Sequence, residues 1–64
     1  MWKVVYIARN RILAEQIKSL LEMEGVMVML KPIGVPHLGD SGAVEILVVE
    51  SEAEDAAEIL STSF

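Results

Sequence analysis

The residues with the clearest capacity for chemistry lie in one segment, Pro32 to Gly42. This segment contains the only histidine of the chain, His37, followed by Asp40 and Ser41. A histidine that is oriented by a carboxylate can act as a general base. However, the chain has no cysteine, and nothing in the sequence around Ser41 marks it as an activated nucleophile. We therefore interpret His37 as a solvent-exposed loop residue, predict no catalytic residue, and expect the protein not to be an enzyme.

Metal and phosphate binding are weak alternatives for the same segment. His37, Asp40 and Glu45 offer at most three metal ligands, and the sequence does not define their geometry. Residues Gly39 to Gly42 favour a turn in which Asp40 caps backbone N–H groups, with a small anion-binding nest as the alternative. The Gly-Lys-Ser/Thr of a P-loop is absent. We expect no metal site and no cofactor.

The segment is nevertheless the strongest candidate for a binding loop. It holds both prolines and three of the four glycines, and it is much longer than a tight hairpin requires. Its apolar side chains should not stay fully solvated; they fold over the end of the sheet or enter a partner. The candidate binding residues are Lys31, Ile33, Val35, His37, Leu38, Asp40 and Ser41.

Two helices and three strands must position this loop. Residues 2–8 are rich in aromatic and β-branched side chains and predict a strand. A helix is predicted over 11–24, where Leu13, Ile17, Leu20 and Leu21 form one apolar stripe. Asn10 should cap its start, with an anion site beside Arg9 and Arg11 as the alternative, and Gly25 should end it.

Strands are predicted again over 26–31 and 43–50, and a capping box of Ser51 and Glu54 should open a second helix. The order βαββα is the ferredoxin-like pattern without its last strand, in a single α+β domain of residues 1–64. We expect a three-stranded sheet of order 1-3-2 with two helices on one face. A right-handed crossover should make the first strand parallel to one neighbour. That strand would lie at an edge, which is a liability unless it is paired or covered.

The chain is expected to need a partner. It is 53% hydrophobic, and a domain of 64 residues without cysteine has few other means of stabilisation. We predict a homodimer in which the helix-free side of the sheet is buried. The candidate interface residues are Trp2, Val4, Tyr6, Met27 and Met29, with Trp2 and Tyr6 on one face of the first strand. The methionines would equally suit an adaptable binding surface or plain core packing.

Charge and hydropathy exclude other classes of partner. The net charge is −5, with acidic residues concentrated in the second half of the chain, so nucleic-acid binding is not expected. Uncharged apolar runs such as residues 26–30 are too short to cross a membrane, and no signal-peptide pattern opens the chain. We predict a cytoplasmic protein that does not bind membranes.

Several short patterns resemble one family, the putative prokaryotic signal-transducing proteins, a small domain of unknown function. The patterns are Tyr6 to Asn10, Ala14-Glu15, Leu20 to Glu22 before Gly25, Gly39 to Gly42 before Val44 to Val49, and Ala56 to Leu60. The resemblance covers nearly the whole chain and implies a bacterial regulatory module with a PII-like, ferredoxin-related topology and no established catalytic residues.

Two functions follow as hypotheses. The first is a non-enzymatic regulatory or signal-transducing module that contacts a protein partner or a small effector. The alternative is a structural or assembly subunit that packs its exposed sheet on another chain.

Overall fold

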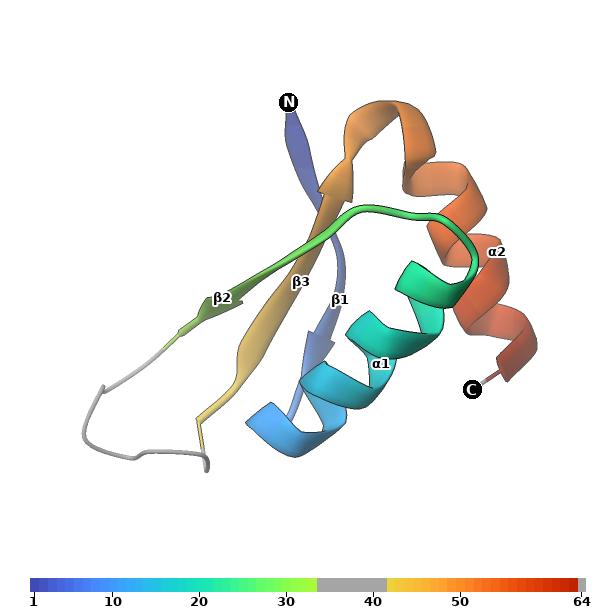
Figure 1. The fold of residues 1–64 in the computed structure, drawn as a ribbon. Helices are drawn as coiled ribbons and strands as arrows, with labels where there is room; N and C mark the ends of the chain where they lie inside the picture. The colour runs from blue at the N-terminus through green and yellow to red at the C-terminus, as the bar shows by residue number, and fades with distance from the viewer. Residues whose placement is uncertain (34–41, 64) are drawn as a thin grey trace.

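The structure is a computed structural model that describes residues 1–33 and 42–63. In chain order its elements are β1 (Trp2–Ala8), α1 (Arg11–Met23), β2 (Val28–Pro32), β3 (Val44–Val49), the 3₁₀ helix η2 (Glu50–Glu52) and α2 (Ala53–Ser63). The strands form one layer, and both helices lie together on one side of it (Figure 1). The predicted α+β order βαββα is confirmed.

The sheet has the predicted strand order, β1-β3-β2, but not the predicted strand direction at β1. β3 is antiparallel to both of its neighbours. The expectation that the first strand is parallel to a neighbour is therefore wrong. The crossover through α1 does make β1 and β2 parallel to each other, but β3 lies between them, so they share no hydrogen bonds.

Both ends of α1 form as the sequence predicts. At the start, the Oδ1 atom of Asn10 accepts a hydrogen bond of 2.8 Å from the backbone N–H of Leu13. At the end, Gly25 has a φ of +85°. Its N–H donates to the carbonyl of Glu22, and the Val26 N–H donates to the carbonyl of Leu21, both at 3.0 Å. This pair of bonds is a Schellman motif, which satisfies carbonyls that the helix itself leaves unpaired.

Replacing Gly25 with alanine should destabilise the protein through the backbone alone. A Cβ atom at this position would meet nothing within 4 Å, so the penalty comes from the positive φ, about 1 to 2 kcal/mol. Gly42→Ala is the matched control, because its Cβ would make only an ordinary contact of 3.4 Å with the carbonyl oxygen of Ile33. Urea unfolding followed by circular dichroism should show a lower midpoint for Gly25→Ala only. Equal midpoints for the two variants would contradict this account.

The boundaries of β2 and α2 differ from the prediction for local reasons. The N–H of Val26 is used in the Schellman motif, so β2 begins later, at Val28, and extends to Pro32. The predicted capping box is wrong: Ser51 lies within η2, which has Val49 at its N-cap and no side-chain cap. The chain turns directly from β3 into a tight 3₁₀ turn, in which the Ala53 N–H reaches the carbonyl of Glu50.

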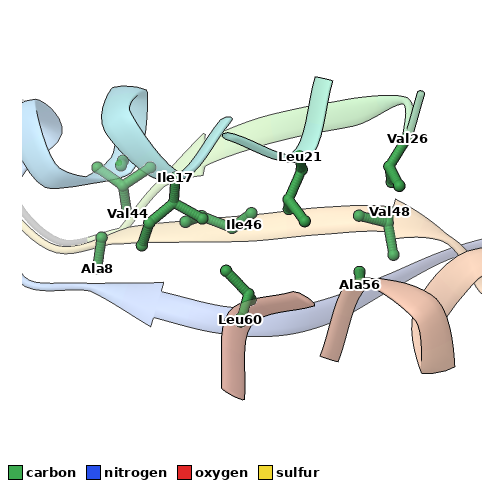
Figure 2. Packing of buried hydrophobic residues seen from close by; sticks show 10 residues of the cluster. Ala8, Ile17, Leu21, Val26, Val44, Ile46, Val48, Ala56 and Leu60 are labelled. Atoms are coloured by element: carbon green, nitrogen blue, oxygen red, sulfur yellow. The ribbon is translucent and has the colours of Figure 1, made fainter. Parts of the chain in front are cut away.

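The hydrophobic core lies between the sheet and the two helices. Figure 2 shows Ile17 and Leu21 of α1 and Leu60 of α2 pointing toward the central strand β3. The cluster consists of buried apolar residues from every main element except β2: Ala8, Ala14, Ile17, Leu21, Val26, Val44, Ile46, Val48, Ala56 and Leu60. The central strand therefore directs alternate side chains into the core. Its remaining side chains point to the side of the sheet away from the helices.

Candidate functional site

The side of the sheet away from the helices is the first candidate site. Ile46 and Val48 of β3 point into the core, so the alternating residues of that strand point to the opposite side. Cross-strand partners share a face. The register pairs Leu47 with Val4 of β1 and with Met29 of β2, which places side chains of all three strands on this side.

We call this surface the helix-free face. Its members are Trp2, Val4 and Ile7 of β1, Met29 and Lys31 of β2, Glu45, Leu47 and Val49 of β3, and Met27, which precedes β2 between two residues packed on the core. Leu47 at its centre is 8% exposed, whereas Ile7 is 54% exposed. The face is therefore mostly apolar, as the sequence predicts, with a buried centre on β3 and exposed apolar side chains on β1 and beside it on β2.

On β1, the residues of the helix-free face differ from the predicted interface residues. A register shift between Val4 and Tyr6 pairs Trp2 with Val49 but Tyr6 with the core residue Ile46. The expectation that Trp2 and Tyr6 share a face is therefore wrong, because a β-bulge reverses the alternation. Ile7, paired with Glu45, takes that place on the helix-free face. Simple alternation cannot reveal a bulge, so sequence reasoning missed Ile7.

Two further members of the face, Leu47 and Val49, were also missing from the predicted interface. Their signal was present in the sequence, since they alternate with Val44, Ile46 and Val48, which form the core side of β3. The other predicted interface residues, Trp2, Val4, Met27 and Met29, lie on the helix-free face and are exposed.

The charges on the helix-free face are balanced. Lys31 of β2 and Glu45 of β3 are cross-strand partners, so one positive and one negative side chain lie next to each other. No other charged residue takes a register position on this side in the part of the chain that the structure describes. The chain's net charge of −5 is thus carried elsewhere.

The predicted binding loop is only partly within the described residues. Lys31 is exposed in β2, and the N–H of Ile33 donates to the carbonyl of Ala43 at 2.9 Å, which extends the hairpin beyond the last strand pair. Ile33 remains 40% exposed beside this end of the sheet. Val35, His37, Leu38, Asp40 and Ser41 lie outside the described residues.

The turn before α1 forms the predicted helix cap. Asn10 uses its side-chain oxygen to cap the helix, as predicted. The Nε of Arg11 forms an ion pair of 3.0 Å with Glu15, and both side chains are exposed. An exposed i,i+4 pair of this kind contributes at most a few tenths of a kcal/mol. The arginine is therefore part of the solvated surface of the helix.

The second candidate site is a hollow on the helical side, between the end of α1 and α2. It is lined by four carboxylates together with small polar and apolar groups: Glu24, Gly25, Val26, Glu52, Asp55, Glu58, Ile59, Thr62 and Ser63. The Oε1 atom of Glu52 is buried there and has no hydrogen-bond partner among residues 1–33 and 42–63. Within those same residues, no three acidic or histidine side chains are placed to hold a metal ion.

Comparison with known proteins gives one match. The sequence model of a family described as putative prokaryotic signal transducing protein matches residues 2–63, nearly the entire chain. The chain belongs to this family. The match confirms the resemblance drawn from the short patterns, and the family is itself a domain of unknown function. No curated protein and no solved structure matched the chain.

No helix within residues 1–33 and 42–63 combines the length and the apolar character that a bilayer span requires.

Proposed function

We propose that this member of the signal-transducing family is a regulatory module that acts by binding, and that its binding surface is the helix-free face. The family description supports a role in signalling. The proposal places the module in the cytoplasm of a prokaryote, in keeping with that description and with a chain that has no cysteine.

One observation carries the proposal. A small domain directs exposed apolar side chains from both edge strands to the same side of its sheet, including Trp2, Ile7 and Met29. Apolar patches of this kind on small proteins mark interaction sites, and tryptophan and methionine are enriched where proteins contact each other. Burial of the face by a partner would remove this surface from water.

The shape and chemistry of the surface favour a protein over a small effector. Small-molecule sites are concave and mainly apolar. Two hollows among the described residues are instead lined by several charged groups: the acidic one between α1 and α2, and one beside α1 and β2 that includes Arg11, Lys18 and Glu22. The apolar side chains lie on an open sheet face, which suits another protein.

Capture from the native lysate tests the proposal with two matched variants. Met29→Lys places a charge on the helix-free face, and Met23→Lys makes the same change at an exposed position, 83% accessible, at the end of α1. Tagged wild type and Met23→Lys should recover the same bound protein, either a second copy of the chain or a different one. Met29→Lys should recover it at least about tenfold less, because a lysine charge must then be desolvated.

Circular dichroism must first show that both variants are folded. Equal recovery by Met29→Lys and wild type would exclude the helix-free face as the binding surface, and recovery of no protein by the wild type would contradict a binding module.

A further inference from the structure

We propose that the occupant of the helix-free face is a second copy of this chain, packed sheet against sheet. The inference rests on the proposed function, which makes this face the binding surface, and adds the identity of the partner. Three features of the described residues support it: the edges of the sheet, the distribution of charge, and the size of the surface.

The edges of the sheet oppose the other simple way of forming a dimer, strand addition. Proteins protect edge strands from pairing with bulges, lysine and proline. The bulge between Val4 and Tyr6 interrupts the regular hydrogen-bonding edge of β1. The opposite edge strand, β2, ends in Lys31 and Pro32. Both edges therefore resist addition of a strand, whereas the apolar residues of the helix-free face have no such protection.

The charge distribution favours a second copy on this face over any other pairing of two identical chains. Lys31 and Glu45 cancel on the face, so the net charge of −5 lies on the rest of each chain. Sheet-on-sheet packing, with the sheets about 10 Å apart, would put the helices of both copies on the outside. The acidic hollow beside α2 would then lie farther from its symmetry mate than the screening length, about 8 Å at physiological salt.

A stable dimer requires burial of a sizeable part of each chain's surface. A standard interface removes about 800 Å² of accessible surface from each partner. The chain exposes 4409 Å², so the requirement is about a fifth of its surface. In a molecule of two layers, the sheet forms one whole side. Packing of two such faces would also cover Trp2, Val4 and Met29, each 39% exposed.

Sedimentation velocity on a matched pair of variants tests the dimer. Ile7→Lys changes a residue of the helix-free face, and Ile12→Lys makes the same change on α1, where the isoleucine is 68% exposed. Wild type and Ile12→Lys should be dimeric at high micromolar concentration. Ile7→Lys should be monomeric, with a dissociation constant raised at least about 100-fold, because two lysine charges would be buried in one interface.

Further measurements separate the alternatives. Val4→Lys, with circular dichroism to confirm folding, should also be monomeric. Agreement between the two variants would show that loss of the dimer depends on the helix-free face and not on a local distortion at Ile7. Hydrogen exchange in the dimer should show no protection confined to β1: any slowing relative to folded Ile7→Lys should extend to the amides of all three strands, since face packing adds no backbone hydrogen bonds and dimerisation stabilises the whole domain. A monomeric wild type, dimeric face variants, or protection gained by the β1 amides alone would each overturn the proposal. If the wild type is monomeric but Met29→Lys still loses a captured protein, only the second-copy inference fails and the proposed function stands.

Discussion

Ile46→Ala should abolish most or all of the stability of the protein. Ile46 is fully buried at the centre of β3, where both helices pack against the sheet (Figure 2). Removing three carbons from a closed core leaves a cavity and costs about 2 to 5 kcal/mol. A single core in a domain of this size rarely supplies more than about 3 to 5 kcal/mol. We therefore expect Ile46→Ala to be largely unfolded without denaturant in far-UV circular dichroism.

Ile12→Ala makes the same change at an exposed position and is the matched control. Ile12 lies in the first turn of α1 and is 68% exposed, so its loss should change the free energy of unfolding by less than about 0.5 kcal/mol. Both variants should be compared at one protein concentration, because dimerisation would make stability depend on concentration. Equal unfolding midpoints for the two variants would mean that Ile46 is not at the centre of the core.

The sequence was sufficient to predict the elements whose signals are local. The apolar stripe of α1 depends on spacing along one helix, and its two ends depend on Asn10 and Gly25, each of which acts within a few residues. The central place of β3 was predicted in another way, from the βαββα order, which is the ferredoxin-like pattern without its last strand.

The errors arose where a residue's position depends on a partner strand or on competition for one hydrogen bond. Alternation along β1 placed Tyr6 beside Trp2, but the bulge that separates them is defined only by pairing with β3. Ser51 and Glu54 have the spacing of a capping box, but η2 begins directly after β3 and uses backbone groups instead. The same competition at Val26, whose N–H closes the end of α1, shortened β2.

These errors changed the candidate site as well as the fold. Four of the five candidate interface residues lie on the helix-free face, but the set included Tyr6 and lacked Ile7, the most exposed residue of β1 on that face. The bulge also changes the interpretation of β1. From sequence, its apolar edge is one of the reasons to expect a partner; in the structure, that edge is interrupted, and the face becomes the stronger candidate.

Ala56→Leu should destabilise the protein by overfilling the core. Ala56 is fully buried where α2 meets the sheet, together with Val48 and Leu60 (Figure 2). Interiors are close-packed, so three added carbons must displace α2 or force strained rotamers, at about 1 to 3 kcal/mol. In a domain of this size each kcal/mol lowers the melting temperature by about 4 to 8 °C. Thermal unfolding should therefore show a decrease of at least about 4 °C.

The neighbouring residue supplies the control for this prediction. Ala57 is exposed on the same turn of α2, so Ala57→Leu adds an identical side chain to solvent and should change the melting temperature little. If both variants melted alike, the small side chain of Ala56 would not set the distance between α2 and the sheet. If only Ala56→Leu melted early, a small side chain at Ala56 would be required for α2 to cover its side of the sheet closely. Coverage of that side alone is what leaves Val4 and Met29, the cross-strand partners of Leu47, exposed for a partner.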